Sequence, residues 1–448
     1  MHFLVVVLGD VGRSPRMQYH CHSLLDAGHN VTFIGYAGEA FEPGSPRCNV
    51  IRFNDPVVPE WVPSFLYFVV RLGLLVMALT SVFWEYCFDT HRVDFVLVQN
   101  PPAMPTLAMA YLFCHVKGFY QRRRPGFIID WHNLGHSMLR NGSLAQRGVQ
   151  LCEEFFGRRA DGHLTVTQAM KEYLASSVGI TNNIQVLYDQ PPDMFAPLNV
   201  EEQHAIFTEL HDQLCSACPP SWLSSSTLPN QTMFTENVAG KIRPRAGRPA
   251  LITSSTSWTP DEDFGILFDA LQLLDDRLSQ ASSEDSSKVL VIVTGKGPQR
   301  AMYEQRIDQH HWTHVAVATL WLPSAMYPRL LACADLGISL HTSTSGLDLP
   351  MKILDLFGCQ IPVVAYHYPT CRELVQENVN GRTFRTQEEL CTVLEEVLAP
   401  LFAAKTASLG NHAYGVLETY SQNLEGRTRW GTNWTEHALP VILRSTPM

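Results

Sequence analysis

The residues best suited to chemistry lie in the segment 345–358, SGLDLPMKILDLFG, which precedes an apolar stretch at 361–364. The segment predicts a loop, a helix that opens near Pro350 and then a buried strand. Lys352 and Asp355 are three residues apart and therefore share one face of the first helical turns. A lysine at a helix N-terminus can hold a phosphate, and a carboxylate one turn later can accept hydrogen bonds from a ribose diol. The pattern suits a nucleoside diphosphate, and the alternative is a surface helix with one ion pair.

Polar loops follow other strands expected in the same half of the chain. A hydroxyl-rich loop at 254–260 leads into a helix with acidic residues in its first turn. The segment 294–298, TGKGP, has glycines that allow close approach of a ligand and a lysine that supplies charge. The loop 342–346 leads to the helix of Lys352. The candidate nucleotide-binding residues are Lys352, Asp355, Lys296, Gly295, Gly297, Ser345, Gly346, Asp348 and Ser257.

Glycines and arginines follow the first expected strand, 3–8. Ser14 followed by Pro15 predicts a helix start, and arginines border it, so this corner suits a second substrate that carries phosphate. The spacing is not a dinucleotide fingerprint, because the third glycine is missing. The alternative is a plain turn with surface arginines. The candidate residues here are Gly9, Gly12, Arg13 and Arg16.

Two further strand ends carry polar groups, at 99–102 (QNPP) and 130–133 (DWHN). The carboxyl ends of strands are where an α/β active site is expected, which makes Asn100 and Asn133 candidate contacts to the same substrate. His132 is a candidate general base because its ordinary pKa lies near neutrality. The alternatives are a structural histidine held by Asp130 or a backbone carbonyl, and Asp10 as the base. Glu153 and Glu154, on the helix that follows, are expected to be structural or solvent-facing.

The elements that must position these residues form two α/β halves, since apolar β-branched runs alternate with helical stretches. We expect an α/β fold of two doubly wound, Rossmann-like domains that face each other across a cleft. The expected strands are 3–8, 31–35, 50–53, 94–98, 127–130, 163–166 and 184–187 in the first half, and 250–254, 289–294, 315–318, 336–340 and 362–365 in the second. The expected domains are an acceptor- and membrane-facing domain at 1–198, a linker with a partly disordered insertion at 199–248, a nucleotide-binding domain at 249–425, and a helix at 426–448 that packs back on the first domain.

Composition excludes several classes of protein. The 448 residues carry a net charge of −10, which argues against a nucleic-acid partner. The 11 cysteines are scattered and form neither a disulfide framework nor a metal-ligand pattern, so no metal site is expected and reduced thiols fit best. No signal peptide is expected, because the first apolar run is too short.

The segment 65–84 is long and apolar enough to be a membrane-span candidate, with Arg71 as its charged residue. The strands on either side of it should lie in one sheet, which argues for a crossover helix rather than a span. Its aromatic residues are typical of a membrane interface, so we expect contact with lipid along one face. The alternative is a wholly buried crossover helix.

Taken together, these residues make the chain resemble the chitobiosyldiphosphodolichol β-mannosyltransferases, a family of GT-B glycosyltransferases. The matching strings lie in order along nearly the whole chain except 199–248. They are 7–20 (VLGDVGRSPRMQYH), 99–102 (QNPP), 129–133 (IDWHN), 155–158 (FFGR), 254–258 (SSTSW), 261–264 (DEDF), 294–298 (TGKGP) and 344–352 (TSGLDLPMK).

The resemblance implies a GT-B fold and transfer of mannose from GDP-mannose to dolichol-diphosphate-linked chitobiose, with a β-1,4 linkage and inversion. It places the enzyme at the cytosolic face of the endoplasmic reticulum membrane, with other mannosyltransferases of the pathway as further partners. Ser345 and Ile353 stand where many retaining GT-B enzymes carry glutamates, so that pattern is absent. Members of the family usually have an N-terminal hydrophobic anchor before the first strand, whereas this sequence begins at that strand, so we expect membrane attachment through 65–84, through partner transferases, or not at all.

The mechanism expected from this resemblance is a single in-line displacement. Lys352 and Lys296 would stabilise the departing diphosphate, and the arginines after the first strand would hold the dolichol diphosphate. No cofactor is required, and stimulation by a divalent cation stays open. The alternatives are a GT-B transferase with another donor or acceptor, and a non-catalytic relative that scaffolds a transferase complex.

Overall fold

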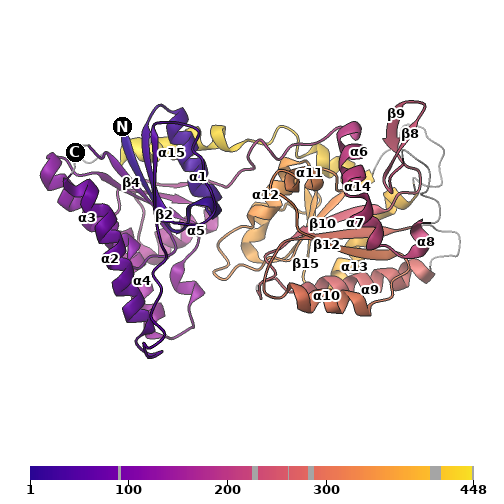
Figure 1. Cartoon of the computed structure of the whole chain (residues 1–448), viewed down its shortest axis with the longest axis horizontal. Coiled ribbons are helices and arrows are strands. Elements are labelled where there is room, and N and C mark those ends of the chain that lie inside the picture. The colour runs from indigo at the N-terminus through magenta and orange to yellow at the C-terminus, as the bar shows by residue number, and fades with distance from the viewer. Residues whose placement is uncertain (89–91, 224–230, 261, 281–286, 404–414, 446–448) are drawn as a thin grey trace. The chain divides into compact units, whose positions relative to one another are not determined.

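The computed structural model describes residues 1–88, 92–223, 231–260, 262–280, 287–403 and 415–445 (Figure 1). The chain divides into two compact units. One comprises Met1–Asp189 and Trp430–Met448, and the other comprises Gln190–Arg429. Each unit has its own parallel sheet covered by helices, as expected for two Rossmann-like domains.

A seven-stranded parallel sheet forms the centre of the first unit, in the order β3-β2-β1-β4-β5-β6-β7. The order reverses between β1 and β4, so the carboxyl ends of these two strands form the switch point at which α/β proteins bind ligands. The strands are β1 (His2–Asp10), β2 (Asn30–Tyr36), β3 (Cys48–Phe53), β4 (Phe95–Asn100), β5 (Gly126–Trp131), β6 (Gly162–Thr165) and β7 (Ile184–Val186).

Helices cover this sheet, and apolar side chains of β1, β2 and β4 pack beneath them. The C-terminal helix packs on α1 and on strands β6 and β7 of the same unit, and its Trp434 is fully buried there. The helices are η1 (Val11–Arg13), α1 (Pro15–Asp26), α2 (Tyr67–Phe88), α3 (Thr106–Gln121), η2 (Gly135–Met138), α4 (Leu144–Gly157), α5 (Gln168–Tyr173), η3 (Leu174–Val178) and α15 (Trp430–Arg444).

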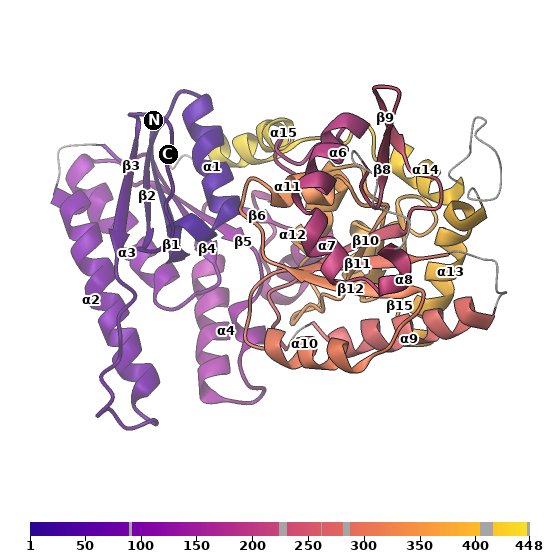
Figure 2. The same ribbon diagram turned by 45° about the vertical axis from the view of Figure 1, so that its right-hand side comes forward.

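Helix α2 is the crossover between β3 and β4, two strands of one sheet, which confirms the expected topology. It packs along α3, and the two helices lie side by side in both ribbon views (Figures 1 and 2). Its inner face is buried through Leu75, Leu79, Val82 and Phe83. By length and composition α2 could cross a membrane, and only 22% of its apolar window is buried inside the protein. The alternative of a wholly buried crossover helix is therefore wrong.

The second unit is built on a six-stranded parallel sheet, in the order β12-β11-β10-β13-β14-β15, with a separate antiparallel pair β8–β9. The order reverses between β10 and β13, so this sheet has its own switch point. The strands are β8 (Thr235–Val238), β9 (Lys241–Pro244), β10 (Ala250–Ser255), β11 (Val289–Thr294), β12 (Val315–Leu320), β13 (Leu336–Ser339), β14 (Val363–Tyr366) and β15 (Gly381–Phe384).

The helices of the second unit enclose two apolar cores, one on each face of the sheet. They are α6 (Val200–Glu209), α7 (His211–Ser216), α8 (Pro220–Leu223), α9 (Phe264–Gln280), α10 (Arg300–Gln309), α11 (Tyr327–Leu331), α12 (Met351–Gly358), η4 (Pro369–Glu373), α13 (Gln387–Ala403) and α14 (Gly415–Gln422). All 11 cysteines of the chain are free thiols.

Most of the described part of 199–248, expected to be a linker, is folded into α6, α7, α8 and the pair β8–β9, whereas residues 224–230 lie outside the described part. Helix α6 opens with a capping box between Asn199 and Glu202. Ile206, Leu210 and Leu214 are at most 3% exposed and belong to a core of the second unit. Ile206 in α6, Leu210 between the two helices and Leu214 in α7 recur every four residues, a periodicity that the polar composition of the segment obscures.

Candidate functional site

Lys352 lies in the first turn of α12, a helix that begins after Pro350 without a side-chain cap. Its ammonium donates to Glu262 Oε1 over 2.8 Å and remains one-third exposed. Glu262 is 3% exposed, and its other carboxylate oxygen accepts from the Thr256 hydroxyl and, at 3.2 Å, from Ser257 N–H. A buried carboxylate thus fixes the lysine, and its partly exposed ammonium remains accessible to a phosphate. Sequence reasoning missed Glu262, although its place in the acidic turn after a hydroxyl-rich loop was a signal; Asp261, beside it, lies outside the described residues.

Asp355 is partly buried one turn after Lys352. The Tyr327 hydroxyl lies 3.4 Å from Asp355 Oδ2 and 3.0 Å from Ser255 Oγ, so the carboxylate belongs to a small polar cluster at the end of β10. Burial raises the pKa of Asp355 to about 7, and Tyr327 and Lys352 oppose that shift only in part. The carboxyl group is therefore poised to change charge near neutral pH.

The glycines of the 294–298 loop are needed for the contact between two loops. A Cβ at Gly295 would lie 1.8 Å from Thr256 O, and one at Gly297 would lie 1.7 Å from Ser257 O. The two loops therefore form one continuous wall, in which Ser257 is exposed. Lys296 is exposed as well, and its ammonium lies 4.1 Å from the ring centroid of Trp321. That cation–π contact gives the lysine a partner within the protein.

The loop before α12 is braced by its own side chains. Asp348 accepts from the Ser343 hydroxyl, and His341 Nε2 lies 3.4 Å from its other carboxylate oxygen. Burial opposes ionisation, but His341 and Ser343 together hold the pKa of Asp348 below its usual range. Ser345 Oγ accepts from Leu347 N–H, and Gly346 has a φ of +71° with open space where a Cβ would stand. Asp348 therefore shapes the loop, and its assignment as a direct ligand is not supported by these contacts.

In the first unit, the fully buried Asp130 at the end of β5 is the hub of the polar groups. It accepts from Arg16 through both carboxylate oxygens at 2.8 Å, from His20 Nε2 at 3.0 Å and from His132 Nε2 at 2.7 Å. Burial opposes ionisation, but Arg16 and the two imidazoles hold the pKa of Asp130 well below its usual range. The side chain is therefore a permanent acceptor.

This acceptor determines the tautomer of His132. An ionised carboxylate can only accept, so His132 Nε2 must carry the proton, and Nδ1 presents a lone pair. The side chain is 22% exposed, which leaves it accessible to a substrate. His20 is fixed differently: Trp434 Nε1–H donates to its Nδ1 over 2.9 Å, and burial lowers its pKa. Of these two histidines, only His132 combines exposure with the geometry of a general base.

Arg16 cannot hold a substrate as expected. It is 2% exposed, and its guanidinium donates to Asp130, to Asp189 Oδ1 at 2.6 Å and to Leu187 O at 2.9 Å. Since these partners occupy the guanidinium inside the protein, the assignment of Arg16 to the acceptor is wrong. The arginine instead ties α1 to the ends of β5 and β7.

Asp10 is also engaged by the protein. Its carboxylate accepts from Gly12 N–H at 2.8 Å and from Glu39 N–H at 3.0 Å. Because these backbone donors engage the Asp10 carboxylate, the geometry does not favour it as the base. Gly12 is required for packing, because a Cβ would lie 2.5 Å from Glu39 O, whereas Gly9 has room for one. Arg13 is 70% exposed and pairs with Glu39, so it stays accessible to an anion.

Asn100, expected to touch the acceptor, is fully buried. Its amide donates to Glu153 Oε1 at 2.8 Å and to Asn133 O at 3.2 Å, which makes it a structural residue and its acceptor assignment wrong. Asn133 Oδ1 accepts from Leu134 N–H. Glu153 is 3% exposed, as the structural role expected for it requires, and accepts from His136 Nδ1 at 2.6 Å. This second histidine–carboxylate pair at the same edge of the sheet was not predicted.

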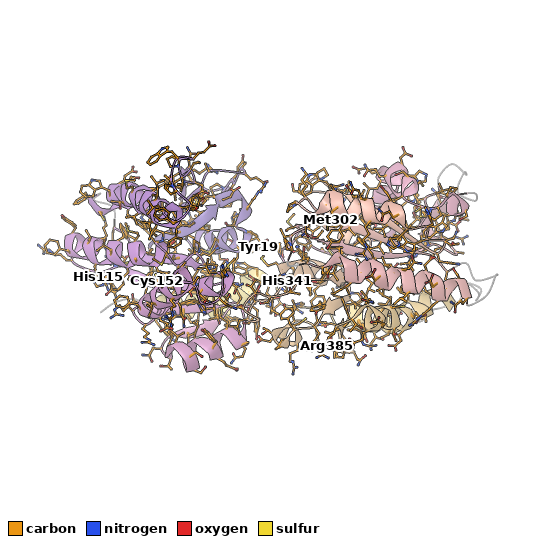
Figure 3. All side chains as sticks on the ribbon, turned by 90° about the horizontal axis from the view of Figure 1, so that it is seen from below. Tyr19, His115, Cys152, Met302, His341 and Arg385 are labelled. Atoms are coloured by element: carbon orange, nitrogen blue, oxygen red, sulfur yellow. The ribbon has the colours of Figure 1, made fainter. Side chains whose placement is uncertain are left out.

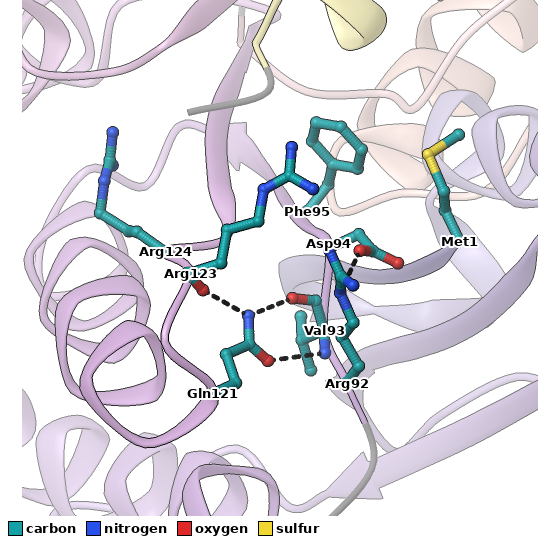
Figure 4. A pocket seen from close by; sticks show the side chains of 8 residues that line it. All are labelled: Met1, Arg92, Val93, Asp94, Phe95, Gln121, Arg123 and Arg124. Atoms are coloured by element: carbon teal, nitrogen blue, oxygen red, sulfur yellow. Dashed lines mark hydrogen bonds and ion pairs between the residues drawn. The ribbon is translucent and has the colours of Figure 1, made fainter. Parts of the chain in front are cut away.

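The opposite edge of the same sheet, where β4 begins, has a hollow of about 350 Å³ (Figure 4). The Gln121 side chain lies beside this hollow, where it accepts from Val93 N–H and donates to Val93 O and Arg123 O. Arg92 forms an ion pair with Asp94. None of the candidate site residues lines this hollow. It lies at the amino ends of the strands, away from the edge at which α/β proteins bind substrates.

Comparison with known proteins agrees with this architecture. The glycosyl transferase 4-like domain matches residues 12–188, and the glycosyl transferases group 1 domain matches residues 250–399. A glycosyltransferase from Rickettsia africae superposes with a TM-score of 0.62 at 13% identity, covering 99% of this chain and 98% of that one. Anabaena HepE, solved with UDP and glucose, gives 0.60 at 16% identity and covers 97% of each chain. These two likenesses show the fold, GT-B.

Closer relatives extend over almost the entire chain. Arabidopsis thaliana UDP-glycosyltransferase TURAN is 38% identical over 98% of this chain and 96% of its own length. Chitobiosyldiphosphodolichol beta-mannosyltransferase of Mus musculus is 36% identical over 99% of this chain and 89% of its own, and that of Dictyostelium discoideum is 32% identical over 96% and 91%. The polar switch points of two Rossmann-like units and this full-length similarity identify a glycosyltransferase that belongs to the chitobiosyldiphosphodolichol beta-mannosyltransferase family.

Proposed function

We propose that this enzyme transfers mannose from GDP-mannose to the terminal GlcNAc of dolichol-diphosphate-linked chitobiose, forming a β-1,4 bond with inversion. The observation that carries the proposal is the similarity, at 32% identity or more along almost the whole chain, to enzymes named for that reaction. The arrangement of the polar groups supports it, because one unit offers a histidine base and the other a lysine at a helix N-terminus.

His132 is the base in this mechanism. Its Nδ1 takes the proton of the acceptor 4-hydroxyl while that oxygen attacks C1 of mannose. The bond between C1 and the diphosphate oxygen breaks in the same step, and GDP leaves from the opposite face. Asp130 keeps the imidazole in the required tautomer and stabilises the imidazolium that forms.

Lys352 stabilises the negative charge that grows on the departing diphosphate. Glu262 keeps Lys352 in place through one hydrogen bond. The N-terminus of α12, where Lys352 lies, carries the positive end of the helix dipole and favours a phosphate in the same place. Asp355 accepts from the ribose diol in its ionised form. The proposal includes no resident cofactor, and parallel assays with EDTA and with Mg²⁺ test whether a divalent cation stimulates the reaction.

We place the enzyme at the cytosolic face of the endoplasmic reticulum membrane, where a dolichol-linked acceptor is available. The exposed face of α2 supports membrane contact, with Tyr67, Phe68 and Trp84 all more than 40% exposed. Phe119 and Tyr120 continue that aromatic surface at the end of α3, next to exposed arginines that suit anionic headgroups. Association with other mannosyltransferases of the pathway stays a prediction.

Transfer of labelled mannose to a synthetic GlcNAc2-diphosphate lipid tests the proposal, with digestion of the product by β-mannosidase. We expect a β-mannosidase-sensitive product, and we expect Lys352→Ala to lower turnover by about a hundredfold or more. Lys352→Arg is the matched control, because it keeps the charge but changes the geometry of the donors. Near-normal turnover of Lys352→Ala would contradict the assignment of the lysine.

A different nucleotide donor is the second candidate function, and one observation favours it: the Arabidopsis relative is named a UDP-glycosyltransferase. Parallel assays with GDP-mannose, UDP-glucose and UDP-N-acetylglucosamine separate the two. Transfer from a UDP-sugar alone would replace the proposed donor. GDP binding without transfer from any donor would instead support a scaffolding role.

A further inference from the structure

An apolar groove of about 530 Å³ lies between three helices of the first unit. Its lining comes from α2, from the start of α3 and from α4, and consists of Leu72, Val76, Met104, Pro105, Ala108, Gly148, Leu151, Cys152, Phe155 and Phe156. These residues have no charged side chain among them. The volume falls in the range of roughly 300 to 1,000 Å³ that small-molecule pockets occupy.

The groove stays open to solvent although its walls are apolar. Leu151 is 66% exposed and Phe155 is 48% exposed, both on the same face of α4. Large apolar side chains that remain exposed around a hollow mark a surface that an apolar partner covers. Cys152, labelled in Figure 3, lies deeper in the groove, where its thiol contacts Ala103 O at 3.7 Å.

Helix α4 joins this groove to the polar edge of the sheet. Cys152 lines the groove, whereas the next residue, Glu153, turns toward the sheet and accepts from His136 Nδ1 and Gly135 N–H. The opposite wall shows the same continuity, because Met104 follows the end of β4 by only four residues, and Asn100 O at that end accepts from His132 N–H. The groove therefore begins beside the edge that presents the proposed base.

We propose that this groove binds the first isoprene units of the lipid chain of the acceptor. The inference rests on the proposed function, since it concerns the acceptor of that same reaction. An acceptor with a sugar diphosphate head and a polyisoprenoid tail needs a polar edge continuous with an apolar channel, and the two faces of α4 provide them. The groove is lined by uncharged side chains and has a volume of about 530 Å³, which suits a few isoprene units rather than a second protein chain.

Larger side chains at Gly148 would block the groove without disturbing the helix. It lies within α4, lines the groove, and a Cβ there would meet no atom within 4 Å. The series Gly148→Ala, Gly148→Leu and Gly148→Trp therefore fills the channel stepwise without a backbone clash, and each residue forms helix better than glycine. Gly73 on α2 is the matched control, because it is also helical and open but lies outside the groove.

The experiment measures KM for GlcNAc2-diphosphate acceptors that carry geranyl, geranylgeranyl or solanesyl chains, in detergent below its micelle concentration. For the wild type we expect KM to fall by about tenfold from geranyl to geranylgeranyl and to change little thereafter, as the groove fills. Gly148→Trp should abolish that gain, Gly148→Leu should reduce it, and Gly148→Ala and Gly73→Trp should retain it. The Kd for GDP should stay unchanged in all of them.

Geranylgeranyl diphosphate, which bears no sugar, separates this inference from the proposed function. Its binding to the wild type and its loss in Gly148→Trp would support the groove even if no mannose were transferred. If the KM for mannose transfer depended on chain length equally in the wild type and in Gly148→Trp, binding of the lipid chain in the groove would be refuted and the proposed function would stand. A variant that weakens binding to phosphatidylcholine vesicles but keeps the chain-length dependence would also overturn it, since the face would then contact the bilayer rather than the acceptor chain.

Discussion

If Asp355 accepts from the ribose as proposed, its pKa makes donor binding depend on pH. The ribose diol donates hydrogen bonds, so it needs the ionised carboxylate as acceptor, whereas the pKa of this group in the free protein is raised to about 7 by burial. Ligand binding must therefore be accompanied by loss of the proton. We expect affinity to be complete well above pH 7 and to weaken as the pH falls below it.

The magnitude follows from the fraction of Asp355 that is ionised. With a pKa of about 7, that fraction is about 9% at pH 6 and about 91% at pH 8. The apparent Kd should therefore be about tenfold higher at pH 6 than at pH 8, which corresponds to about 1.4 kcal/mol. At pH 7, binding should release about half a proton for each ligand bound.

Titration calorimetry with GDP-mannose is the suitable assay, because its diphosphate has no terminal phosphate group that titrates in this range. Measurements in two buffers of different ionisation enthalpy count the released protons. Asp355→Asn is the matched control: it keeps the shape of the side chain, should bind about ten- to a hundredfold more weakly at pH 8, and should lose the pH dependence. A flat Kd between pH 6 and pH 8 in the wild type, or the same slope in Asp355→Asn, would refute the reasoning.

Other predictions concern single residues of the two units. His132→Ala should abolish transfer while the Kd for GDP stays unchanged, whereas His136→Ala should retain measurable transfer; the reverse result in the mannosyl-transfer assay would make His136 the base. Arg16→Met should lower stability by about 3 to 5 kcal/mol, because it leaves the buried Asp130 and the partly buried Asp189 without their cation; an unchanged thermal unfolding profile would refute the buried ion pair. Gly297→Ala should weaken GDP binding by displacing the loop it faces, and calorimetry with an unchanged Kd would show that this wall does not contact the nucleotide.

Local patterns were enough to predict both parallel sheets. The strands at 3–8 and 289–294 are apolar β-branched runs bounded by turn residues, and each proves to be a buried internal strand of its sheet. The helix of Lys352 was equally clear, since Pro350 marks its start. The segment 199–248 was misjudged because its few apolar residues are spread among polar ones, and only the packed core shows which of them share a face.

The candidate site was likewise predictable from the sequence only in part. The sequence alone indicated the strand ends at which polar side chains gather, because that depends on residues adjacent in the chain. Which of those side chains are free for a substrate was decided only by the tertiary structure. Arg16 is removed from the surface by Asp130, 114 residues away, and Lys352 is positioned by Glu262, 90 residues away. The physical reason is that burial and charge pairing depend on neighbours in space, whereas periodicity and capping depend on neighbours in the chain.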